Sequence, residues 1–161
     1  MRAILLIDHG SIRAEANRMI ECMGSLVQHM AGDAAIVRVA HMELAEPTIA
    51  QGFESCVEAG ASEVVAFPYM LSPGKHSTRD IPRMVAEAAA AHPGVRFVVT
   101  PAFGVNARLA EVVLDRAGIA ARVASTAPGC CMRPSDSPPR YCGEGCREVA
   151  DALVGAGTVD D

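Results

Sequence analysis

The stretch AILLIDHGS, residues 3–11, decides the fold of this chain. Its first five residues form a continuous apolar run, and a polar Asp-His-Gly-Ser segment follows at once. A short apolar run without polar alternation is typical of a strand that is buried on both faces of a parallel sheet. Similar runs, rich in β-branched residues, occur at residues 36–40, 63–70 and 95–100. The sequence therefore predicts four buried strands.

Stretches with helical spacing of apolar residues separate and follow these runs. They are expected at residues 14–30, 47–59, 82–91 and 106–117. Pro47 stands at a favoured first helical position, and Gly60 follows the end of the same stretch. This alternation predicts an α/β fold with an open four-stranded parallel sheet, helices on both faces and right-handed crossovers.

Composition excludes several classes of protein. Of the 161 residues, 50% are hydrophobic, which excludes wholesale disorder. The net charge of −5 and the absence of Trp argue against a nucleic-acid partner. No uncharged apolar run is long enough for a membrane span, and Asp8 and His9 interrupt the N-terminal apolar run, as a signal peptide would not. We therefore expect a cytoplasmic protein.

The character of the chain changes near residue 123. Residues 125–146 contain four Pro, four Cys and three Gly with little hydrophobic periodicity. This predicts an α/β domain over residues 1–123 and an irregular Cys-rich extension over residues 124–161. Structural disulfides are rare in the cytosol, so the clustered thiols indicate an iron–sulfur cluster, a tetrahedral zinc site or redox chemistry, with spare thiols in an unstructured tail as the alternative. Cys22 and Cys56 fall within helical apolar patterns and are expected to be buried.

Two histidines lie in loops that follow predicted strands. His9 comes after the first strand and His76 after the third. Because the carboxyl ends of parallel strands meet at one edge of a sheet, both imidazoles should project from the same edge. Two neutral imidazoles that face one cavity are a start for a divalent metal site. The alternative is that each ring is bonded to a nearby backbone carbonyl group.

Polar residues in the neighbouring loops extend this candidate site. Glu43 follows the second strand and could accept protons or complete a metal shell, or else, with Glu46, favourably charge the start of the next helix. Arg13, Lys75 and Arg79 could neutralise an anionic ligand, or simply form a solvated surface. The candidate substrate contacts are Ser11, Arg13, Lys75, Ser77 and Arg79, although Ser77 could instead cap the next helix.

Several short motifs together resemble one family. They are LLIDHGS at residues 5–11, MELAEPTI at 42–49, VVAFPYML at 64–71, GKH at 74–76, RDIP at 79–82 and PAFG at 101–104. In this order and spacing, over residues 1–117, they resemble the small sirohydrochlorin chelatases, which are class II tetrapyrrole chelatases. The resemblance implies a four-stranded parallel sheet and a homodimer built around its active site.

The resemblance also implies an activity. Fe²⁺ or Co²⁺ would be inserted into sirohydrochlorin, with loss of two pyrrole protons, for siroheme or cobalamin biosynthesis. The two motif histidines of the family, here His9 and His76, would hold the metal, and Glu43 stands where the family has a carboxylate. The substrate carries several carboxylates, which suits basic residues at the cavity rim.

The Cys-rich tail resembles that of plant-type sirohydrochlorin ferrochelatases, some of which carry an iron–sulfur cluster there. A [2Fe–2S] cluster is accordingly expected on Cys130, Cys131, Cys142 and Cys146. This likeness makes iron the first choice of inserted metal and cobalt a close second, with nickel also conceivable. A non-catalytic carrier of metal or tetrapyrrole is the alternative from another functional class.

Overall fold

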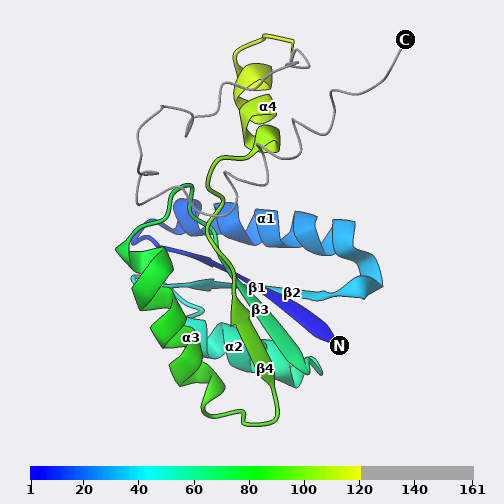
Figure 1. Ribbon diagram of the computed structural model, residues 1–161, viewed down its shortest axis with the longest axis vertical. Coiled ribbons are helices and arrows are strands. Elements are labelled where there is room, and N and C mark those ends of the chain that lie inside the picture. The colour runs from blue at the N-terminus through cyan, green and yellow to red at the C-terminus, as the bar shows by residue number, and fades with distance from the viewer. Residues whose placement is uncertain (121–161) are drawn as a thin grey trace, which may run out of the picture. The chain divides into compact units, whose positions relative to one another are not determined.

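The structure is a computed structural model that describes residues 1–120. The expected domain boundary at residue 123 and the four clustered cysteines lie outside the described residues. Four strands, β1 (Arg2–Asp8), β2 (Ile36–His41), β3 (Glu63–Pro68) and β4 (Arg96–Val99), form one parallel sheet in the order β2-β1-β3-β4 (Figure 1). The predicted four-stranded parallel sheet is therefore confirmed.

The helices alternate with the strands along the chain. They are α1 (Ala14–Ala31), α2 (Ile49–Glu58), α3 (Ile81–Ala89) and α4 (Ala107–Arg116), with a short 3₁₀ turn η1 (Gly32–Ala34) and a π-helical turn η2 (His76–Asp80). The chain divides into two compact units, and the first, Met1–Ala102, holds the sheet and α1 to α3. The second unit begins at Phe103 and contains α4, which starts where the Asn106 side chain accepts a hydrogen bond from the Arg108 N–H.

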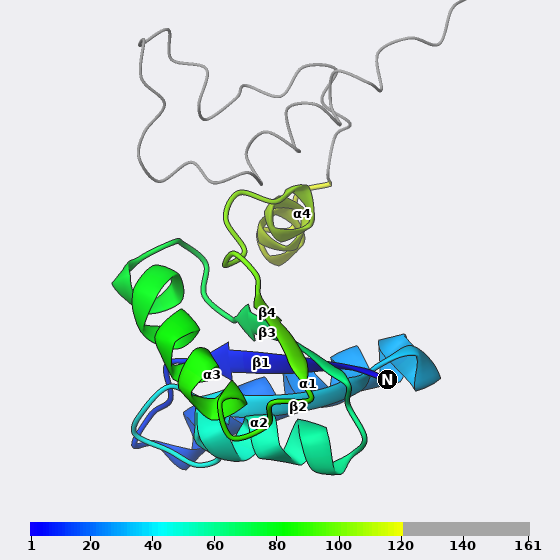
Figure 2. The same cartoon turned by 60° about the horizontal axis from the view of Figure 1, so that its bottom comes forward.

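Both faces of the sheet are covered, as the apolar run of β1 requires. Helix α1 packs on one face, whereas α2 and α3 pack on the other (Figures 1 and 2). Leu5 and Ile7 point into the larger core beneath α2 and α3, which also contains Phe53 and Val85. Leu6, between them in sequence, joins the smaller core beneath α1. Each fully buried aliphatic side chain contributes roughly 1.5–3 kcal/mol to this packing.

The outer edge of β2 is closed by side chains. Gln28 of α1 accepts a hydrogen bond from the Val37 N–H through Oε1 (2.8 Å). Its Nε2 donates to the carbonyl oxygens of Gly32 and Ala35 (2.9 and 3.0 Å). The carbonyl oxygen of Val37 in turn accepts from the Arg38 guanidinium (2.9 Å). The outward-facing N–H and carbonyl groups of Val37 on this edge strand are thus satisfied within the chain.

Two details of the helices differ from the sequence expectation. Pro47 is not the first residue of α2, because it precedes the N-cap Thr48 and follows a cis peptide bond. Thr48 and Gln51 form a capping box, in which side chain and backbone of each residue bind the other, and this fixes the helix start. The π-helical turn η2 before α3 was not expected from the apolar pattern.

The two cysteines of the described region have different environments. Cys56 is buried in the core beneath α2, as predicted. The prediction for Cys22 is wrong, because this residue is exposed. Helix α1 covers the sheet with a narrow stripe that includes Ile20 and Met23, and Cys22 lies off that stripe. Among residues 1–120, no helix has the length and apolarity needed to cross a membrane.

Candidate active site at the carboxyl edge of the sheet

The loops after β1 and β2 lie side by side because the strands are neighbours. Backbone pairing continues past the strand ends, where the Met42 N–H donates to the Asp8 carbonyl oxygen (2.9 Å). The Glu43 N–H donates to the His9 carbonyl oxygen (3.1 Å). Residues 9 and 43 are therefore held at fixed positions relative to each other.

His9, Glu43 and His76 come together at this edge. His9 Nε2 lies 3.0 Å from Glu43 Oε1, and both side chains are about half exposed. The rings of His9 and His76 meet edge to face, with centroids 5.3 Å apart. The structure thus places the three candidate catalytic residues within one solvent-accessible cluster.

His76 is oriented by the π-helical turn η2. Its Nδ1 lies 3.0 Å from Asp80 Oδ2, while Asp80 Oδ1 accepts a hydrogen bond from Arg79 Nε (3.0 Å). Desolvation raises the pKa of Asp80, but hydrogen bonds from Arg79 and His76 outweigh it, and the net pKa lies below the usual value. An ionised Asp80 favours the tautomer that carries its proton on Nδ1, which leaves His76 Nε2 free as an electron-pair donor.

The candidate substrate contacts have different surroundings. Arg13 and Lys75 are exposed, and Arg79 is exposed while it binds Asp80. The Ser11 backbone is clamped by the Asn17 side chain, and the Ser11 hydroxyl accepts a hydrogen bond from the Arg13 N–H (3.1 Å). Ser77 is buried, and its hydroxyl donates to the Gly74 carbonyl oxygen and accepts from the Gly74 N–H. The Ser77 hydroxyl is therefore used inside the turn.

Sequence reasoning missed a pair beneath this site, of which one member is fully buried. His41 is fully buried at the end of β2, and its Nδ1 lies 2.6 Å from Asp8 Oδ1 at the end of β1. The available signal was the position of both residues, since each is a polar residue that directly ends an apolar strand.

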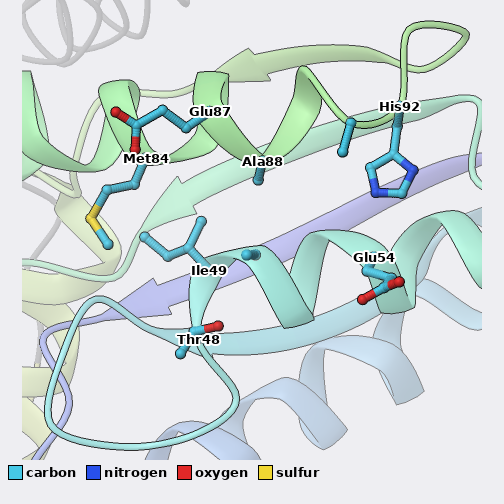
Figure 3. A pocket seen from close by; sticks show the side chains of 9 residues that line it. Thr48, Ile49, Glu54, Met84, Glu87, Ala88 and His92 are labelled. Atoms are coloured by element: carbon cyan, nitrogen blue, oxygen red, sulfur yellow. The ribbon is translucent and has the colours of Figure 1, made fainter.

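The groove of about 570 Å³ between α2 and α3 is separate from this cluster (Figure 3). It is lined by residues 48–50, Glu54, Met84, Glu87, Ala88, Ala91 and His92. The His92 ring stacks on Phe53 with centroids 5.7 Å apart, so it belongs to the packing of α2. Within the described residues, no three His, Cys, Asp or Glu side chains are arranged to hold a metal ion together.

Comparison with known proteins assigns the family. The CbiX family model matches residues 3–120, so the chain belongs to this family of sirohydrochlorin chelatases. The chloroplastic sirohydrochlorin ferrochelatase of Arabidopsis thaliana is 42% identical over 113 residues, which are 70% of this chain and 50% of the relative. The sirohydrochlorin cobaltochelatase of Methanococcus maripaludis is 30% identical in an alignment that covers 73% of this chain and 98% of the relative.

Solved structures agree with this assignment. The sirohydrochlorin chelatase SirB from Bacillus subtilis subspecies spizizenii, in complex with cobalt, matches with a TM-score of 0.67 at 29% identity, over 73% of this chain and 50% of that one. A putative cobalamin biosynthesis CbiX protein from Marinobacter aquaeolei matches with a TM-score of 0.62 at 27% identity, over 73% of this chain and 95% of that one. The chain spans half or less of the first curated relatives, from 50% down to 37% of their length.

Proposed function

We propose that this protein inserts a divalent metal ion, Fe²⁺ or Co²⁺, into sirohydrochlorin. The observation that carries the proposal is the meeting of His9, Glu43 and His76 at one sheet edge, with the two rings 5.3 Å apart and the carboxylate 3.0 Å from His9. The relatives named above, which are sirohydrochlorin ferrochelatases and cobaltochelatases, support it.

The residues suit the chemistry of metal insertion. A tetrapyrrole must lose two pyrrole protons as the metal enters, and the ion must be held loosely enough to be released. Two imidazoles make a weaker and more open site than the four-ligand shells of structural zinc. The Glu43 carboxylate, 3.0 Å from His9 Nε2, would accept these protons. Exposed Arg13 and Lys75 are available to substrate carboxylates.

Iron is our first choice of inserted metal and cobalt our second, because the Cys-rich tail resembles that of plant-type sirohydrochlorin ferrochelatases. Relatives of both kinds support the broader activity, and two imidazoles do not discriminate among these ions. We also propose that a second copy of the chain completes the site, since a large flat tetrapyrrole needs walls on both sides. The [2Fe–2S] cluster on the four clustered cysteines is proposed as a structural or regulatory group outside the reaction.

The decisive experiment is an anaerobic spectral assay with purified protein, sirohydrochlorin and either Fe²⁺ or Co²⁺. Wild-type protein should accelerate metal insertion over the uncatalysed reaction. His9→Ala and His76→Ala should each reduce the rate at least about tenfold with an unchanged circular dichroism spectrum. His29→Ala is the matched control, because His29 is an exposed histidine in the last turn of α1. A protein that binds sirohydrochlorin without accelerating insertion would be a carrier.

A further inference from the structure

We infer that His41 is a positioning residue, whose buried imidazole keeps the loops that carry His9 and Glu43 in register. The expected effect of His41 on metal binding rests on the proposed function. The geometry that supports the inference does not depend on that function.

A single carboxylate oxygen connects the two loops. Asp8 Oδ1 lies 2.6 Å from His41 Nδ1 and also accepts a hydrogen bond from the Gly10 N–H (3.0 Å). A hydrogen bond to an ionised carboxylate is shorter and stronger than a neutral one. Asp8 directly precedes His9, and Gly10 directly follows it. The His41 ring therefore fixes the backbone on both sides of His9.

The same contact reaches Glu43 through the backbone. Glu43 is two residues after His41, and its N–H donates to the His9 carbonyl oxygen. The two loops pack so closely that a Cβ on residue 10 would lie 1.9 Å from the Glu43 carbonyl oxygen. At the other end of the second loop, the His41 N–H donates to the Pro47 carbonyl oxygen (2.8 Å). Loss of the contact between His41 and Asp8 would therefore loosen the backbone register of the two loops, which sets the 3.0 Å distance between His9 Nε2 and Glu43 Oε1.

Packing alone does not account for a histidine at this position. His41 Nε2 is buried and finds no hydrogen-bond partner among residues 1–120. A buried polar atom without a partner disfavours folding, whereas an apolar ring of similar size would pack without that cost. Local choices that oppose stability concentrate at functional sites. What the imidazole offers and a phenyl ring does not is the Nδ1–H that binds Asp8.

Two amide variants separate positioning from packing. The side-chain nitrogen of His41→Asn can take the place of Nδ1, whereas that of His41→Gln is nearer the place of Nε2. His41→Phe keeps the ring and removes the donor. Val85→Ala is the control for general loss of packing, because it truncates a buried side chain of α3. Asp8→Asn changes the other partner of the contact, because it keeps an acceptor oxygen for His41 Nδ1 but removes the negative charge.

The measurements are amide hydrogen exchange at Gly10 and Glu43, and the affinity of the full chain for Co²⁺ alone. In His41→Gln and His41→Phe, exchange at both amides should rise at least tenfold beyond the change in global stability, and Co²⁺ affinity should fall at least tenfold. His41→Asn should remain within about threefold of wild type on both measures, and Asp8→Asn should lie between. Val85→Ala should lower stability without a selective effect on either amide or on Co²⁺.

Equal exchange and equal Co²⁺ affinity in the Asn and Gln variants would overturn the inference, as would wild-type values in His41→Phe. Faster exchange with unchanged Co²⁺ affinity would also overturn it, because the loops would then not position metal ligands. If wild-type protein binds Co²⁺ but does not insert it into sirohydrochlorin, the proposed function fails while these comparisons still decide the role of His41.

Discussion

Replacement of Gly10 by alanine tests how closely the two site loops must approach. Gly10 has φ = +83°, in the left-handed region, where a side chain costs roughly 1–2 kcal/mol. Its Cβ would lie 1.9 Å from the Glu43 carbonyl oxygen, whereas carbon–oxygen contacts are normally no closer than about 3.3 Å. The loops would have to separate by roughly 1.4 Å, which breaks the hydrogen bonds from the Met42 and Glu43 N–H groups, each worth about 0.5–1.5 kcal/mol.

We therefore expect Gly10→Ala to lower the free energy of unfolding by about 2–5 kcal/mol and to weaken Co²⁺ binding at least tenfold. Gly60→Ala is the matched control, because Gly60 has a similar φ of +91° but no atom within 4 Å of an added Cβ. This control should lose only about 1–2 kcal/mol and keep its Co²⁺ affinity. Urea unfolding and Co²⁺ titration measure both quantities. Equal destabilisation in the two variants, with Co²⁺ affinity intact in Gly10→Ala, would refute the close-approach reasoning.

Four further outcomes are expected. Glu43→Gln should lower the insertion rate at least tenfold and alter its pH profile, whereas Glu46→Gln should do neither. If the rate and pH profile of Glu43→Gln matched those of the wild type, Glu43 would only contribute favourable charge to the start of the next helix. Burial raises the pKa of the Cys56 thiol to about 11, against a smaller opposing effect of the Arg38 guanidinium. At pH 8, iodoacetamide should therefore label exposed Cys22 before Cys56, and equal labelling of the two in peptide maps would contradict the burial of Cys56. Sedimentation at micromolar concentration should give about twice the mass of one chain, and an active monomer would exclude a shared cavity. Protein purified without oxygen should be brown and should lose its visible absorption in Cys142→Ser; a colourless preparation without iron or sulfide would exclude the cluster.

The strands could be predicted because burial on both faces leaves a direct mark on the sequence. The apolar run at residues 3–7 became β1, with Leu5 and Leu6 in opposite cores. The predicted ends of the strands are mostly within one or two residues of the observed ends, since each run stops where polar loop residues begin. The shared edge of His9 and His76 followed from the parallel order of the strands alone.

The other features did not follow from the apolar pattern, for different reasons. The capping box of Thr48 and Gln51 is local, and its Thr-x-x-Gln spacing marks a helix start more directly than the residue type at position 47 does. The exposure of Cys22 depends on how wide a stripe of α1 meets the sheet. The pair of Asp8 and His41 joins residues 33 positions apart and was visible only as two polar strand ends.

The closed edge of β2 restricts how copies of this chain can assemble. A strand added alongside β2 would have to remove Gln28 from the Val37 N–H and the Arg38 guanidinium from the Val37 carbonyl oxygen. Natural sheets use such coverage to prevent edge-to-edge joining and aggregation. A second copy is therefore expected to meet the chain through side-chain surfaces and not through one continuous sheet that runs across β2. The same coverage also protects a single chain from uncontrolled strand addition at this edge.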